Sequence, residues 1–144
     1  MSGQPRRVKV ALGDRAYDIL IGADLIARAG EHCAPHIPKR RAIVVTDDAV
    51  ARLHLDALTR ALKAAGIDAP SVVVPAGEAS KDFAEFGRLM ERLLDQRPDR
   101  DTVLIALGGG VVGDLCGFAA SVLLRGVDFI QVPTTLLAMV DSSV

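Results

Sequence analysis

Three consecutive glycines, Gly108, Gly109 and Gly110, are the residues whose type and spacing most directly suggest chemistry. Glycines let the backbone approach a ligand closely and take positive φ. The β-branched and apolar run 102–107 precedes them and the small-residue run 111–124 follows, which predicts a strand, a tight loop and a buried helix. The free N–H groups and the positive dipole end of such a helix favour an anion. This stretch therefore predicts a phosphate cradle.

The same loop satisfies the dinucleotide-binding pattern G-x-G-x-x-G through Gly108, Gly110 and Gly113. The usual fingerprint lies at the first βα turn and has an acidic residue at the end of the next strand. Here that strand ends in Gln131-Val132-Pro133, so ribose recognition must come from another part of the chain. A tight turn that only packs a strand against a helix is the alternative interpretation of these glycines.

The elements that must position the loop are predicted from hydrophobic periodicity and turn residues. Strands are predicted at residues 7–12, 16–21, 41–45, 70–74, 102–107 and 129–132, and helices at 23–33, 48–65, 81–96 and 111–124. Gly13-Asp14 joins the first two strands into a hairpin. The later alternation of strands and helices predicts a Rossmann-like α/β fold, a mostly parallel sheet with helices on both faces behind an N-terminal β-hairpin.

Ligands bind such sheets beyond the carboxyl ends of the strands. Four polar or glycine-rich segments fall on that edge: Thr46-Asp47, Gly77-Glu78, Gly108–Gly110 and Pro133-Thr134-Thr135. Asp47 or Asp48 is expected to cap the following helix. The helix at 81–96 is expected to carry one broad apolar stripe, formed by Phe83, Phe86, Leu89, Met90, Leu93 and Leu94.

Composition indicates a single domain, residues 1–144, with an aliphatic core, because 50% of the residues are hydrophobic and only 3% are aromatic. The net charge of −1 and the absence of a basic stripe argue against a nucleic-acid partner. No apolar run is long enough for a membrane span, and no signal peptide is evident. The two distant cysteines, Cys33 and Cys116, fit a reducing, cytoplasmic setting.

Several motifs in register resemble the signature run of the 3-dehydroquinate synthase family. They are Val44-Val-Thr-Asp47, Pro75-Ala-Gly-Glu78 with Lys81, Gly108-Gly-Gly-Val-Val-Gly-Asp114, Gly117-Phe118-Ala119, Arg125-Gly126, Gln131-Val-Pro-Thr-Thr-Leu-Leu137 and Val140-Asp-Ser-Ser-Val144. The resemblance implies an enzyme that uses NAD and a divalent metal, zinc or cobalt, to convert a keto-acid sugar phosphate into 3-dehydroquinate and phosphate in the shikimate pathway. It also implies a homodimer.

The resemblance assigns roles to individual residues. It implies contacts to the adenosine ribose from Asp47, Glu78 and Lys81, contacts to the pyrophosphate from Gly109 and Gly110, and a lining of the remaining cofactor groove by Asp114, Thr134, Thr135 and Leu137. Arg125 corresponds to the arginine that reaches the substrate phosphate, often across the dimer interface. Asp141, with Ser142, corresponds to a carboxylate near nicotinamide and substrate. Ala49 departs from the family, where asparagine is common.

No metal ligands are predicted in this sequence, because the family's metal site belongs to a later, helical domain. The chain is therefore expected to be the N-terminal NAD-binding half of such an enzyme and to be inactive alone. Three alternatives stay open: another sugar-phosphate cyclase such as a valiolone-type synthase, an alcohol dehydrogenase of the glycerol or iron-dependent type, and a non-catalytic nucleotide-binding module. Glu78 and Lys81 could equally form a solvated ion pair, and Arg125 could simply end a helix.

Overall fold

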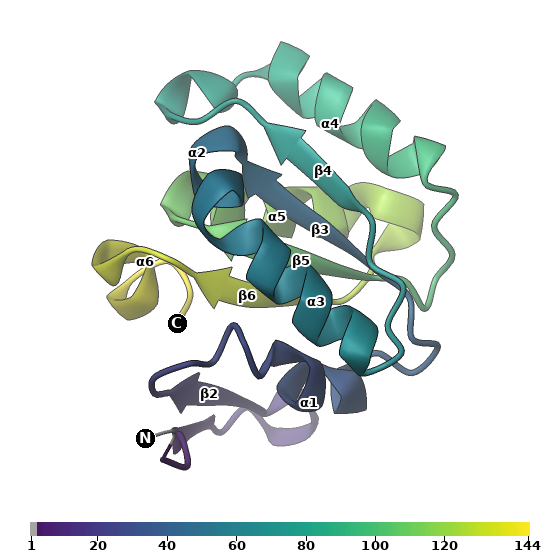
Figure 1. Ribbon diagram of the computed structural model, residues 1–144. Helices are drawn as coiled ribbons and strands as arrows, with labels where there is room; N and C mark the ends of the chain where they lie inside the picture. The colour runs from purple at the N-terminus through teal and green to yellow at the C-terminus, as the bar shows by residue number, and fades with distance from the viewer. Residues whose placement is uncertain (1–2) are drawn as a thin grey trace.

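The computed structural model describes residues 3–144; Met1 and Ser2, which the single-domain prediction includes, lie outside the described residues. The chain forms two sheets (Figure 1). Strands β1 (Arg6–Val10) and β2 (Tyr17–Ile21) pair antiparallel as a hairpin, which confirms that prediction. The main sheet is parallel, in the order β4-β3-β5-β6, and contains β3 (Ala42–Asp47), β4 (Ser71–Val74), β5 (Val103–Gly108) and β6 (Phe129–Pro133).

The two central strands are the most deeply buried elements. Every residue of β5 is buried, and so is every residue of β3 except Asp47 at its end. A strand covered on both faces reads as an uninterrupted apolar run, as Ala42–Val45 and Val103–Leu107 do. These runs therefore fix the centre of the sheet and bring the ends of β3 and β5 side by side.

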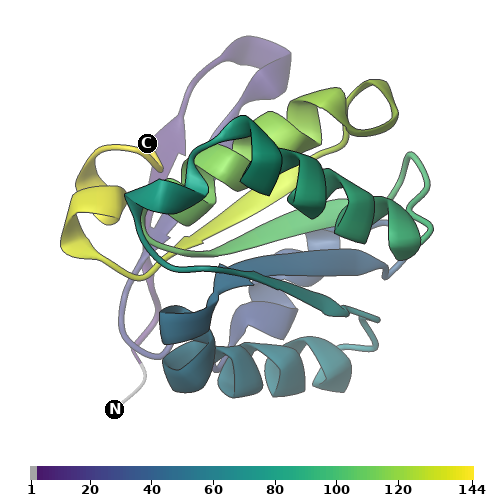
Figure 2. The same cartoon turned by 90° about the horizontal axis from the view of Figure 1, so that it is seen from above.

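Helices cover both faces of the sheet, as the sequence predicts (Figure 2). One face packs against α4 (Phe83–Asp95) and α5 (Gly110–Val122), around residues such as Leu89 and Cys116. The other packs against α1 (Ala29–Cys33) and α3 (Asp56–Ala64), around residues such as Leu58 and Leu62. The sheet therefore lies between two helical layers, with an aliphatic core on each of its faces.

The strand order reverses between β3 and β5. From β3 the chain moves to β4 on one side and then returns across to β5 on the other. In open parallel sheets the crevice for a ligand opens at this topological switch point, beyond the carboxyl ends of the two strands. Asp47 ends β3 and Gly108 ends β5, so the sequence motifs flank that point.

The helix predicted at residues 23–33 is mostly wrong. Only Ala29–Cys33 is α-helical, followed by a 3-10 turn at Ala34–His36, while residues 23–28 form turns. Asp24 has a positive φ of 59°, which a right-handed helix does not accommodate. The helix predicted at 48–65 is present as α2 (Asp48–Val50), a π-helical turn (Ala51–Leu55) and α3. Gly66 ends it with a φ of +75°, a conformation that suits glycine.

The apolar stripe predicted for α4 is also narrower than expected. Leu89 and Leu93 are buried, and Phe86 and Met90 pack against the core. Phe83 is 92% exposed and Leu94 is 51% exposed, because these two residues flank the contact with the sheet and do not lie within it. No helix of the described residues is long and apolar enough to cross a membrane.

Candidate functional site

The glycine loop joins β5 to α5 with its backbone donors uncapped. Gly109 is the N-cap of the 13-residue helix α5, and no side chain among residues 3–144 caps that end. The first helical N–H groups have no partner within a helix, because the carbonyl that each would bind lies before its start. They therefore remain available to an acceptor outside the helix, and the helix dipole favours an anionic one.

The absence of side chains on the glycines keeps this place open. A Cβ atom on Gly109 would lie 3.2 Å from Thr135 Cγ2, and one on Gly110 would lie 3.6 Å from Ser142 Oγ. The backbone N–H of Thr134 donates to the carbonyl of Gly108 at 2.9 Å. Thus Thr134, Thr135 and Ser142, all predicted site residues, lie against the predicted glycines.

A short helix that the sequence analysis did not predict lies between Thr135 and Ser142. Helix α6 (Leu136–Val140) begins at Thr135, whose hydroxyl accepts a hydrogen bond from the N–H of Ala138 at 3.1 Å. A threonine before the apolar run 136–140 is the signal that could have revealed it. Leu137 is 72% exposed and Asp141, at the end of α6, is also exposed, so neither predicted residue is enclosed by the described chain.

Asp47 uses one carboxylate oxygen in a structural bond, and its other oxygen has no hydrogen-bond partner among residues 3–144. Its Oδ1 atom accepts from the N–H of Val50 at 2.7 Å, which makes Asp47 the N-cap of α2. The neighbouring Asp48 is not a cap. It accepts from the N–H of Ala76 at 3.2 Å and so ties the loop after β4 to the end of β3, a contact that sequence reasoning missed.

The remaining predicted charges form a small cluster. Lys81 Nζ lies 2.8 Å from Asp114 Oδ2 and 3.9 Å from Glu78 Oε2. The hydrogen bond to Asp114 is the main cause that raises the pKa of Lys81, so the amine stays cationic at neutral pH. The pair links the turn after β4 to the beginning of α5.

Arg125 does not join this site within the chain. It ends the 3-10 turn Leu123–Arg125, which follows α5, whereas the glycine loop precedes that helix. With a rise of about 1.5 Å per residue, the two ends of α5 are roughly 20 Å apart. Leu124 and Arg125 have positive φ values of 48° and 70°, an uncommon conformation for residues with a side chain.

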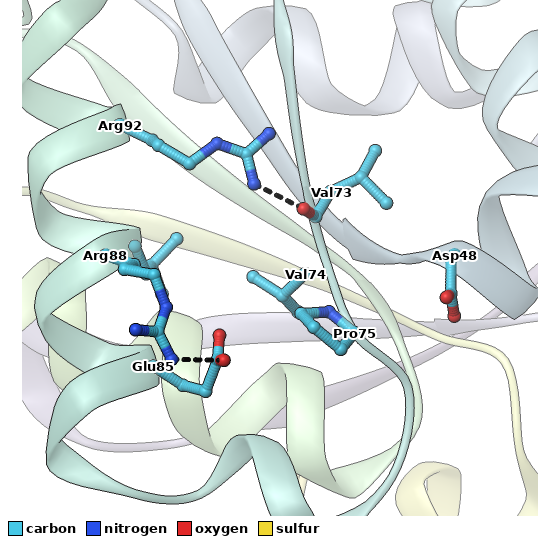
Figure 3. Close-up of a pocket in the computed structure, with 8 residues that line it drawn as sticks. Asp48, Val73, Val74, Pro75, Glu85, Arg88 and Arg92 are labelled. Atoms are coloured by element: carbon cyan, nitrogen blue, oxygen red, sulfur yellow. Dashed lines mark hydrogen bonds and ion pairs between the residues drawn. The ribbon is translucent and has the colours of Figure 1, made fainter.

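A separate hollow of about 380 Å³ lies between β4 and α4 (Figure 3). It is lined by Asp48, Val73, Val74, Pro75, Glu85, Arg88, Leu89 and Arg92. Its arginines already have protein partners: Arg88 pairs with Glu85 at 2.5 Å, and Arg92 donates to the carbonyl of Val73 at 2.5 Å. It contains no glycine-loop residue, so the candidate site is the crevice and not this hollow.

The crevice contains no set of metal ligands. Among residues 3–144, no group of three or more His, Cys, Asp or Glu side chains is placed to hold a metal ion. What the described residues offer is backbone N–H groups, hydroxyls, two carboxylates and an ion pair. These groups suit a ligand that carries both an anion and sugar hydroxyls.

Comparison with known proteins gives consistent matches. Residues 71–144 match the family model described as 3-dehydroquinate synthase N-terminal. The 3-dehydroquinate synthase of Rhodospirillum rubrum is 60% identical over 135 residues, which cover 94% of this chain and 35% of that protein. The chain therefore spans about a third of the length of the curated relatives it matches.

Solved structures give the same fold. A 2-deoxy-scyllo-inosose synthase complexed with carbaglucose-6-phosphate, NAD+ and Co2+ matches with a TM-score of 0.84 and 26% identity, over 95% of this chain and 38% of that one. A 2-epi-5-epi-valiolone synthase from Streptomyces hygroscopicus subsp. jinggangensis with NAD+ and Zn2+ bound has a TM-score of 0.75 and 27% identity, over 92% and 36%. Because the family model matches residues 71–144, half of the chain, the chain belongs to the 3-dehydroquinate synthase family.

Proposed function

We propose that this chain is the NAD-binding part of a 3-dehydroquinate synthase, which converts a keto-acid sugar phosphate into 3-dehydroquinate and phosphate. The observation that carries the proposal is the uncapped start of α5 behind Gly109, at the switch point between β3 and β5. The likeness to two cyclases whose structures contain NAD+ supports it. In this proposal residues 1–144 are one NAD-binding domain, and the divalent metal is held by a further domain.

In this proposal, different residues of the chain contact different parts of NAD. The N–H groups behind Gly109 and Gly110 would hold the pyrophosphate, and the free oxygen of Asp47 together with Glu78 would accept hydrogen bonds from ribose hydroxyls. Asp114, Thr134, Thr135, Leu137 and Ser142 would line the rest of the groove, and Asp141 would face the reacting end. When bound, NAD supplies a reversible oxidation of the substrate hydroxyl, which acidifies the neighbouring C–H bond.

Arg125 fits this proposal through a second subunit. It lies at the far end of α5 from its own glycine loop, so it would reach the substrate phosphate of a partner in a homodimer. A guanidinium fork suits a phosphate, because it donates two parallel hydrogen bonds. We also propose a cytoplasmic protein without nucleic-acid or membrane partners, which its net charge of −1 and its two free, buried cysteines support.

Identity favours the dehydroquinate branch over the rival cyclase. The Rhodospirillum rubrum 3-dehydroquinate synthase is 60% identical, whereas the valiolone synthase is 27% identical. Another of the alternatives is a nucleotide-binding module without catalysis. It would share the glycine loop and the Asp47 carboxylate but would need no arginine at the end of α5.

Two measurements on the purified chain test the proposal. Calorimetric titration should show weak binding of NAD and weaker binding of NADP, because the carboxylates of Asp47 and Glu78 would repel a 2′-phosphate. A phosphate-release assay with the sugar-phosphate substrate and added zinc or cobalt should show no turnover. Turnover by this chain would overturn the division into domains, and equal affinity for NADP would overturn the ribose assignment.

A further inference from the structure

The outer surface of α4 and α5 carries large apolar side chains that residues 3–144 leave exposed. Both helices pack on the same face of the main sheet, where they lie side by side (Figure 2). On α5, Phe118 is 54% exposed and Val122, one turn later, is 47% exposed. On α4, the two exposed apolar residues are Phe83 and Leu94. We call these four residues the outer apolar patch.

The outer apolar patch is large for a soluble monomer. A phenylalanine side chain offers about 150–250 Å² of surface, so Phe83 and Phe118 alone leave on the order of 300 Å² open to solvent. The rings of Phe86 and Phe118 lie with their centroids 4.7 Å apart, which makes the apolar surface continuous from one helix to the other. Contiguous apolar patches of a few hundred Å² or more mark interaction sites, so this surface fits a protein partner.

The position of Arg125 indicates which partner fits. Arg125 lies directly beyond the patch, because α5 ends at Val122 and the 3-10 turn Leu123–Arg125 follows it. The glycine loop lies at the other end of α5, roughly 20 Å away. When two copies pack their α5 helices antiparallel about a twofold axis, the Arg125 end of one copy lies beside the glycine-loop end of the other. A different protein on this patch would bring no second glycine loop to Arg125.

We propose that the outer apolar patch is the interface between two copies of this chain, with their α5 helices antiparallel and Phe118 near the twofold axis. Phe118 is the ninth of the 13 residues of α5, so it lies close to the middle of the helix. This inference rests on the proposed function, because it assumes that Arg125 binds the substrate phosphate of a partner. The family resemblance implies a homodimer, and the inference adds the surface and the orientation of the two copies.

The size of the surface sets the expected strength of the dimer. The helices α4 and α5 have 13 residues each, so each is about 20 Å long. At an interaxial distance of about 10 Å, the two helices together present roughly 400 Å². A stable complex buries about 800 Å² per partner, which is twice as much. The chain should therefore dimerise weakly, with a dissociation constant on the order of 100 µM.

Sedimentation equilibrium of the 144-residue chain, from micromolar to millimolar concentration, tests the interface. Phe118→Glu places two like charges near the axis and should weaken dimerisation about tenfold or more. Because Phe118 also contacts Phe86, thermal melts establish that this variant is folded, and Phe83→Glu should weaken dimerisation without disturbing that contact. Leu53→Glu is the matched control. It changes an exposed leucine in the helical turn before α3, on the opposite face of the sheet, and should leave the dissociation constant within about twofold.

Two mixing experiments test the orientation of the copies. An equimolar mixture of Phe118→Glu and Phe118→Lys should dimerise again, because opposite charges then meet near the axis. In the second mixture, an unlabelled Arg125→Cys chain carries a nitroxide, which attaches selectively because Cys33 and Cys116 are buried. This chain should broaden the amide NMR signals of Gly109 and Gly110 in isotope-labelled wild type, and a diamagnetic analogue of the label should not.

The contradicting outcomes are distinct. A chain that stays monomeric at millimolar concentration would overturn the inference, and so would a dimer that Leu53→Glu weakens as strongly as Phe118→Glu does. A dimer in which the nitroxide leaves both glycine signals sharp would overturn the antiparallel arrangement. Titration of NAD into the same samples separates this inference from the proposed function. A patch-dependent dimer that does not bind NAD would support the interface and contradict the proposed function.

Discussion

Asp47 offers the sharpest separation between a structural and a binding role. Its Oδ1 atom caps α2 through the N–H of Val50 at 2.7 Å, while its other oxygen is proposed to accept from ribose. Asn is as good a cap as Asp, but it lacks the charge and offers a single oxygen. Asp47→Ala therefore removes both the cap and the charged acceptor, whereas Asp47→Asn removes only the charged acceptor.

The expected magnitudes follow from these contacts. Asp47→Ala loses the cap and should lower the free energy of unfolding by about 1 kcal/mol, which corresponds to a melting temperature about 4 °C lower for a domain of this size. Asp47→Asn should stay within about 0.5 kcal/mol of the wild type, since only the charge at the helix start is lost. Both variants should bind NAD about tenfold more weakly, because a charged acceptor is worth roughly 1.5 kcal/mol or more.

Circular-dichroism melts and NAD titrations of the same samples provide the assay. The reasoning is refuted if both variants bind NAD as tightly as the wild type, while Asp47→Ala alone melts at a lower temperature. Asp47 would then be a helix cap only. Asp48, which bonds the N–H of Ala76, provides the matched control: Asp48→Asn should retain that acceptor and leave the affinity for NAD unchanged within about twofold.

Three further predictions concern stability. Gly30→Ala should cost about 1–3 kcal/mol in denaturant unfolding, because its Cβ would lie 2.2 Å from the carbonyl oxygen of Ala61; an unchanged midpoint would contradict the close packing of α1 on α3. Leu93→Ala should lower the free energy of unfolding by about 2–5 kcal/mol, whereas Phe83→Ala, at a residue 92% exposed, should leave it within about 0.5 kcal/mol of the wild type. Similar losses for both variants would show that the apolar stripe of α4 is as broad as the sequence predicted. Burial raises the pKa of Cys33 to about 11 and that of Cys116 to about 12, from an ordinary 9.0. Because the folded pKa values lie above the unfolded one, the thiols' contribution to stability should be complete below pH 9 and should fall as the pH rises toward 11 and 12; unfolding midpoints that rise over this range would contradict it.

The fold could be predicted where the local hydrophobic pattern clearly favoured either a strand or a helix. The short apolar runs at Ala42–Val45 and Val103–Leu107 favoured central strands, and the glycines followed by a long small-residue run favoured a turn into a buried helix. The prediction of a helix at 23–33 was wrong over its first half because hydrophobic periodicity carries no information on the sign of φ. Asp24 adopts a positive φ, which interrupts a right-handed helix. The predicted apolar stripe of α4 was too wide, because the number of helix residues that contact a sheet depends on the orientation of the helix on that sheet.

Much of the candidate site followed from the rule that ligands gather at the carboxyl ends of parallel strands. That rule predicts that Asp47, Glu78 and Gly109 lie on one edge of the sheet. It did not predict the pairing of Lys81 with Asp114, because the partner of a long, flexible side chain depends on the distance between two loops. The position of Arg125 at the far end of α5 follows from a different prediction, the helix expected at 111–124.

The most direct test of the central claim is a map of amide chemical-shift changes as NAD is added to the isotope-labelled chain. The account predicts that the largest changes fall on Gly109, Gly110 and the residues after them, with smaller changes at Asp47 and Glu78. It is contradicted if the changes cluster instead around Arg88 and Arg92 in the hollow beside β4, or if NAD at millimolar concentration leaves the glycine amides unchanged.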